Sequence, residues 1–251
     1  MSGCRYFIYL SYNGTAYHGW QIQPNGVSVQ EVLEKSLSTL LRTETSVTGA
    51  GRTDAGVHAR LMVAHFDTDI GINVDDMVKK LNSILPFDIA IHKVIKVKND
   101  AHARFDALSR TYEYHVVTGK NVFRRDFATR IQEPLDWDAM NNAAAMLLSF
   151  TDFTSFSKLH TDVKTHLCKI TYAKWERSGD EWIFTITADR FLRNMVRAVV
   201  GTLFDVGKGK ISLDDFKAIV DAKDRCKAGV SVPAQGLYLT DISYPEEIFT
   251  L

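Results

Sequence analysis

The same order of structural elements occurs twice along the chain, and this repetition restricts the folds available to it. In the first half, apolar periodicity and turn residues predict strands and helices in the order strand, helix, strand, strand, helix, strand, over residues 5–12, 29–42, 46–50, 61–66, 73–85 and 89–97. Ser28 and Glu31 have the S-x-x-E spacing of a helix start, and Pro86 ends the second helix. This order is the ferredoxin-like arrangement.

The second half repeats the order without any residue-level similarity to the first. Its predicted elements are a strand, a helix, a hairpin, a helix, a short helix capped by Ser212 and a last strand, over residues 108–118, 136–149, 169–177 with 182–188, 192–206 and 236–243. We therefore expect an α+β protein of two ferredoxin-like halves, 1–102 and 103–251. Their strands should form one extended antiparallel sheet with helices on one face and the other face open to a ligand.

The composition is that of an ordinary globular protein. The 251 residues are 45% hydrophobic and 24% charged, which excludes a disordered or fibrous chain. Lys plus Arg and Asp plus Glu both number 30, so the zero net charge argues against a protein that coats nucleic acid nonspecifically, although a local basic groove is compatible with it. Arginines gather at 104–130 and 190–197, whereas acidic residues gather at 67–76 and after residue 239.

The cysteines and the hydropathy pattern bear on location. Cys4, Cys168 and Cys226 are odd in number and show no CxxC spacing, which disfavours a disulfide framework and a thiolate zinc site. Residues 6–30 carry no Asp, Glu, Lys or Arg, but polar residues, glycine and proline interrupt them, so they cannot span a bilayer. Since no signal-peptide pattern is visible either, we expect a cytoplasmic protein that does not engage membranes.

The segment most informative about chemistry is GAGRTDAGVHA at residues 49–59, between two predicted strands. Its small residues leave Asp54 open to close approach by a substrate. The commoner role of such an aspartate is to hydrogen-bond nearby backbone amides in a turn. A phosphate-binding P-loop is excluded, because no Gly-Lys-Ser/Thr follows. We disfavour a metal site, because its candidate ligands do not have an established ligand spacing. These candidates are Asp54, His58, His65, Asp67 and Asp69.

This segment resembles the signature of the tRNA pseudouridine synthase A family, and further motifs extend the resemblance over nearly the whole chain. They are YNGTAYHGWQIQP at 12–24 with VQE at 29–31, ARFDA at 103–107, RTYEY at 110–114, FLRNMVR at 191–197 and PAQGLYL at 233–239. Asn13 departs from the pattern, because the family commonly has an aspartate there.

The resemblance implies an isomerase that converts uridine to pseudouridine at positions 38–40 in the anticodon stem-loop of tRNA. The glycosidic bond is broken at N1 of the base and remade at C5, so neither a cofactor nor a metal is expected. The resemblance also implies a symmetric homodimer, in which one tRNA contacts both subunits, and an active site in the cleft between the two halves.

The motifs assign a role to three residues. Asp54 matches the catalytic aspartate; as a nucleophile it could attack the sugar, attack the base or remove a sugar proton. Arg197 matches the arginine that keeps this carboxylate ionised where water is excluded, although a structural ion pair is the alternative. Tyr112 matches the tyrosine that stacks on the flipped uracil, although a place in the core is the alternative. We expect Tyr114 on the opposite face of the same strand, in the core.

Other arginines are candidates for RNA contact. Arg52 is assigned to flipping the nucleotide or binding its phosphate, with an ordinary surface arginine as the alternative. Arg193 lies in the FLRNMVR motif. The arginines between 104 and 130 could form a patch for the RNA backbone, although a solvated side chain is the commoner role of any one of them: Arg104, Arg110, Arg124, Arg125 and Arg130.

Two other functions compete with this interpretation. One is an RNA-binding or chaperone-like protein that has lost catalysis, and the presence of Asp54, Tyr112 and Arg197 speaks against it. The other is a metal-dependent hydrolase that uses Asp54 and His58, which removal of metal by a chelator would inactivate.

Overall fold

The computed structural model describes residues 3–158 and 164–249, and the chain divides into two compact units. Unit 1 comprises residues 1–108 together with 239–251, and unit 2 comprises residues 109–238. The expected boundary after residue 102 lies six residues before the observed break, but the C-terminal segment returns to unit 1. Within the described residues, no helix has the length and apolarity needed to cross a membrane.

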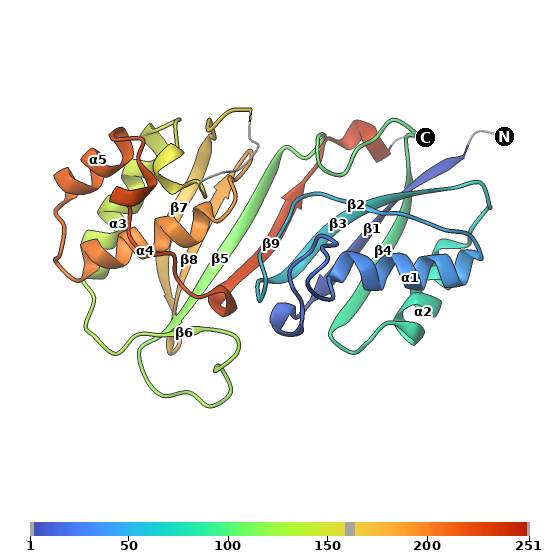
Figure 1. Cartoon of the computed structure of the whole chain (residues 1–251), viewed down its shortest axis with the longest axis horizontal. Coiled ribbons are helices and arrows are strands. Elements are labelled where there is room, and N and C mark those ends of the chain that lie inside the picture. Colours follow the sequence, from blue (N-terminus) through green and yellow to red (C-terminus); the bar gives the residue numbers. More distant parts are fainter. Residues whose placement is uncertain (1–2, 159–163, 250–251) are drawn as a thin grey trace. The chain divides into compact units, whose positions relative to one another are not determined.

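Unit 1 has the predicted ferredoxin-like order. Its strands are β1 (Cys4–Tyr12), β2 (Thr48–Gly49), β3 (His58–Thr68) and β4 (Ile89–Val97). They pair antiparallel in the order β4–β1–β3–β2, and the end of β9 (Leu237–Ser243) lies beside β3. Helices α1 (Val29–Leu41) and α2 (Val74–Ile84) contact each other and pack on this sheet (Figure 1).

Unit 2 contains an antiparallel sheet with the order β5–β8–β7. These strands are β5 (Ser109–Val117), β7 (Ile170–Ser178) and β8 (Glu181–Ala188), and β6 (Thr129–Arg130) pairs in parallel with the end of β5. Helices α3 (Trp137–Met146), α4 (Met195–Gly207) and α5 (Leu213–Asp221) pack together in this unit (Figure 1). Trp175 is fully buried between the sheet and the helices, with its ring 5.1 Å from Phe184 and 5.8 Å from Phe204.

Local sequence signals explain where the helices start. The side chain of Ser28 accepts a hydrogen bond from the amide of Glu31, and that of Asn73 accepts one from Asp76, which satisfies amides that have no partner inside the helix. Ser212 and Asp215 form a complete capping box at α5. Short 3₁₀ turns supplement the helices at Gly14–Ala16, Leu147–Ser149, Thr154–Phe156, Arg225–Lys227, Ala234–Gly236 and Glu246–Phe249. The predicted α+β class is confirmed.

One prediction about β5 is wrong. Tyr112 and Tyr114 are two residues apart on a strand whose pairing with β8 is regular, so both side chains lie on the same face. Tyr114 is in the core, as expected, with its hydroxyl 2.5 Å from Thr129 Oγ1. Glu113 and His115 occupy the opposite face, because they alternate with the two tyrosines.

Candidate functional site

Asp54 lies at the start of a tight turn in unit 1. The amide of Val57 donates a hydrogen bond to the carbonyl oxygen of Asp54 at 3.1 Å, and Gly56 has a φ of +78°. A positive φ at this third position is the requirement of a type II turn, and glycine meets it without strain. Ala55 is exposed and Asp54 is half-buried, so the residue with the carboxylate lies at the surface of the turn next to a small side chain.

The N-terminal motif at 12–24 packs against this turn and forms hydrogen bonds to it. The hydroxyl of Tyr12 lies 2.9 Å from Thr53 Oγ1, and the amide of Trp20 donates to the carbonyl oxygen of Thr53. A Cβ atom on Gly19 would lie 2.3 Å from that same carbonyl oxygen, and one on Gly14 would lie 2.0 Å from the carbonyl oxygen of Val57. The two backbone segments therefore touch at Gly14 and Gly19, where a larger residue would clash. The N-terminal motif and the Asp54 segment thus pack as one unit.

The histidines near Asp54 have structural partners. His58 is buried, and its Nδ1 accepts a hydrogen bond from the amide of Gly14; Nδ1 of His65 accepts one from the amide of Ala103. Asp67 forms a two-bond ion pair with Arg5. Across the part of the chain that the structure describes, no group of three potential ligands is placed to hold a metal ion.

Asn13, a departure from the family pattern, also has a structural role. Its side-chain oxygen accepts hydrogen bonds from the amide and the hydroxyl of Thr15, at 3.0 and 2.7 Å, and so caps the 3₁₀ turn Gly14–Ala16. An aspartate oxygen could accept the same two bonds. The substitution is therefore compatible with an unchanged turn.

Tyr112 and Arg197 belong to unit 2. Tyr112 is buried on β5, and its ring meets the edge of Phe191 at 5.1 Å and 86°. Arg197 lies in the first turn of α4, and its Nε donates a hydrogen bond of 2.7 Å to the carbonyl oxygen of Val232. In return, the amide of Val232 donates to the carbonyl oxygen of Arg197. These two hydrogen bonds hold the backbone and the Nε atom of Arg197 beside Val232.

The start of α4 is an unusual helix end. Asn194 has a φ of +65° and makes no side-chain cap bond; instead its Nδ2 donates to the hydroxyl of Ser231. A Cβ atom on Gly201 would lie 1.9 Å from the carbonyl oxygen of Val230, so the segment before Pro233 packs directly on the helix backbone. This packing holds in place the segment to which Arg197 is bonded.

The other predicted arginines differ in their surroundings. Arg52 is exposed and forms no ion pair with the described residues. Arg193 is exposed, and its carbonyl oxygen accepts from the amide of Lys158. Arg104 is exposed, with its guanidinium 5.6 Å from the centre of the Phe105 ring, whereas Arg110 donates to the carbonyl oxygen of Asp189 at 2.8 Å.

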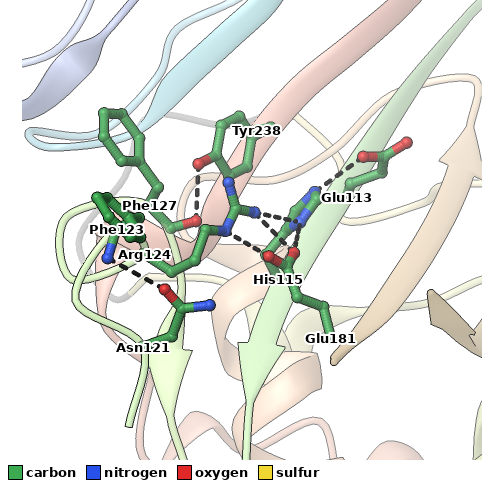
Figure 2. A network of polar contacts seen from close by, with 8 residues as sticks. All are labelled: Glu113, His115, Asn121, Phe123, Arg124, Phe127, Glu181 and Tyr238. Carbon is green, nitrogen blue, oxygen red and sulfur yellow. Dashed lines mark hydrogen bonds and ion pairs between the residues drawn. The ribbon is translucent and has the colours of Figure 1, made fainter. Parts of the chain in front are cut away.

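Arg124 is not part of an open RNA-binding patch. Its Nη2 donates to Glu181 Oε2 at 2.6 Å and lies 3.2 Å from Nδ1 of His115, whose Nε2 is 2.9 Å from Glu113 Oε2 (Figure 2). Burial pushes the pKa of Glu181 upward, but the hydrogen bonds from His115 and Arg124 outweigh it and leave this pKa below its ordinary value. Arg124 is therefore an anchor within the protein. Glu113 and His115 are two residues apart on β5, and this spacing is the sequence signal for a polar cluster on one face of the strand.

Comparisons with known proteins agree with this arrangement. The family described as "tRNA pseudouridine synthase" matches residues 8–106 and 143–245, which include Asp54 and Arg197 but not Tyr112. The chain is 60% identical to tRNA pseudouridine synthase A of Bacteroides fragilis over 99% of this chain and 100% of that protein. It is 57% identical to the protein of that name from Bacteroides thetaiotaomicron, over 98% and 93%, and 42% identical to that from Exiguobacterium sibiricum, over 96% and 97%. The chain belongs to the tRNA pseudouridine synthase family, a family of isomerases.

Proposed function

We propose that this protein isomerises uridine to pseudouridine at positions 38–40 in the anticodon stem-loop of tRNA, with Asp54 as the nucleophile and with the target nucleotide flipped out of its stack. Family membership supports the reaction and the tRNA substrate. The observation that carries the residue assignment is the carboxylate of Asp54, which stands on a braced turn between small neighbours.

The chemistry of the reaction requires such a carboxylate. The bond between C1′ of the ribose and N1 of uracil breaks, and a bond between C1′ and C5 forms; a proton leaves C5 and N1 gains one, so the atoms balance without a co-reactant. Cleavage of a glycosidic bond develops positive charge on the sugar, which an adjacent carboxylate stabilises or captures covalently. A flipped base exposes both N1 and C5 to rearrangement.

The remaining residues have supporting roles in this proposal. Tyr112 stacks on the flipped uracil, an interaction that contributes ~1–3 kcal/mol. Arg197 supplies the positive charge that keeps the carboxylate ionised when water is excluded. Arg52, two residues before Asp54 and exposed, contacts the phosphate of the flipped nucleotide. Arg104, Arg110 and Arg193 are further candidates for contacts with the tRNA backbone.

The decisive experiment measures tritium release from tRNA labelled at C5 of uridine. The wild-type protein should release tritium, and the Asp54→Ala variant should release none while binding tRNA with an affinity within about tenfold of wild type. Normal release from Asp54→Ala would refute the assignment of the nucleophile. Treatment with a chelator should leave the wild-type rate unchanged, whereas the hydrolase alternative requires a loss.

We propose further that the protein is a cytoplasmic homodimer. The support is the resemblance of its motifs to those of the family. Light scattering of the purified protein at micromolar concentration should give a mass of twice the 28.3 kDa chain, and a mass of one chain would contradict the proposal.

A further inference from the structure

The loop between β5 and β6, residues 118–128, is irregular but firmly attached to unit 2. The Arg124 anchor joins its middle to Glu181 and His115, and the hydroxyl of Tyr238 donates a 2.7 Å hydrogen bond to the carbonyl oxygen of Phe127 (Figure 2). The side chain of Asn121 accepts a bond from the amide of Phe123. These contacts fix the conformation on both sides of the loop tip.

The loop tip presents apolar side chains to solvent. Val122 is 69% exposed and Phe123 is 86% exposed, although hydrogen bonds hold the residues around them. Single exposed apolar residues are common on proteins, but an exposed aromatic residue on a braced loop is pre-organised for contact. The loop lies outside the stretches that the family description matches, 8–106 and 143–245.

The charges around the tip select the kind of partner. Lys120, Arg125 and Arg130 are exposed and make no ion pair with the described part of the chain, and Asp126 is the acidic residue among them. The charge of Arg124 is already balanced by Glu181. Cations that flank an aromatic ring suit a polyanion with planar groups, which is the chemistry of unpaired RNA.

The size of the tip argues against a protein partner. A stable protein interface buries roughly 800 Å² on each side, far more than two side chains provide. The loop tip and Tyr112 lie on opposite faces of the sheet. Arg124 lies beside His115, and His115 is three residues from Tyr112 on β5, so the two side chains point to opposite faces. Any nucleotide that Phe123 contacts is therefore a different nucleotide from the one stacked on Tyr112.

We propose that Phe123 stacks on an unpaired base of the tRNA away from the isomerised uridine, and that Lys120 and Arg125 contact the adjoining phosphates. This inference rests on the proposed tRNA substrate but not on the chemistry assigned to Asp54. It adds to the site a second point of attachment, which increases the affinity for tRNA without acting on the reacting atoms.

The test compares tRNA binding by wild type and Phe123→Ala in fluorescence anisotropy with full-length tRNA. Loss of one stacked base should weaken binding by about 5- to 150-fold. Phe123→Trp should bind within about threefold of wild type, because it keeps an aromatic face. The matched control is Phe87→Ala in unit 1: Phe87 is fully exposed as well, but residues 81–92 contain no Lys or Arg. It should bind as wild type does.

Two further measurements, thermal unfolding and light scattering, make the outcome decisive. Thermal unfolding of Phe123→Ala should match wild type, since the side chain is in solvent, and its mass by light scattering should be unchanged. Wild-type affinity in Phe123→Ala would overturn the inference, and so would a change of oligomeric state, which would identify a contact between copies. A wild-type protein that binds tRNA without tritium release would contradict the proposed reaction but leave the Phe123 comparison valid.

Discussion

The Asp54 turn of unit 1 and the 118–128 loop of unit 2 are both irregular segments, but they are held by different physical means. The Asp54 turn is held by neutral hydrogen bonds and by glycines that allow backbones to touch. The 118–128 loop is held by a cluster of charged groups around Arg124. Close packing leaves almost no room for added atoms. A partly solvated ion cluster loses less stability when one of its charged groups is replaced. The two segments should therefore respond very differently to substitution.

The largest effect is expected from Gly19→Ala. Its Cβ atom would lie 2.3 Å from the carbonyl oxygen of Thr53, and its φ of +89° is unfavourable for alanine. We expect a loss of about 2–4 kcal/mol in unfolding free energy and a loss of most tritium release. The matched control is Gly51→Ala, since a Cβ atom there meets nothing within 4 Å. Urea denaturation checks both, and equal stability of the two variants would show that the turn is not closely packed.

A smaller effect is expected from Arg124→Gln. The substitution leaves the carboxylate of Glu181 beside His115 without its cation, in a place where both partners are partly exposed. The expected loss in unfolding free energy is roughly 1–3 kcal/mol, below that of a fully buried pair. Arg125→Gln, at the exposed neighbouring position, should change the unfolding free energy by less than about 0.5 kcal/mol. Similar losses in both variants would contradict the anchoring role of Arg124.

The smallest effect concerns the pH dependence of unit 1. Burial lowers the pKa of His65 from 6.5 to about 4, with the charge of Arg5 acting in the same direction. Because the unfolded chain binds the proton more readily, the stabilisation is complete above pH 6.5 and is lost as the pH falls toward 4. Between pH 6.5 and pH 4.5 we expect a loss of about 1–2 kcal/mol in the free energy of unfolding.

The variant His65→Asn isolates this contribution. Its side-chain oxygen can still accept the bond from the amide of Ala103, but it does not titrate. Urea midpoints at pH 6.5 and 4.5 should differ less in the variant than in wild type. An unchanged difference would assign the pH dependence to other groups.

Local signals in the sequence were enough to predict most elements of the fold. Ser28 and Asn73 mark helix starts because a cap depends on residues a few positions apart. The 46–50 strand is shorter than predicted, with only Thr48–Gly49 paired, because strand length depends on the partner. The prediction of opposite faces for Tyr112 and Tyr114 is wrong, because the two-residue period of a strand places both on one face.

The sequence predicted the candidate site only in part. The small residues around Asp54 indicated a tight, accessible turn, and Gly56 provides the positive φ that this turn needs. The fit of Gly14 and Gly19 against the turn could not be predicted, because it depends on which distant backbones meet. The ion pair of Arg124 could not be predicted for the same reason, because its partner Glu181 lies 57 residues away.

The most direct test of the proposed function uses Asp54→Asn, which keeps the size of the side chain and removes its negative charge. The measurement is single-turnover tritium release from tRNAs in which uridine 38, 39 or 40 alone carries the C5 label. The wild-type protein should release tritium from at least one of these positions, and Asp54→Asn should release none from any position while still binding the tRNA. Release by Asp54→Asn at the wild-type rate would contradict the central claim that the carboxylate of Asp54 carries the reaction.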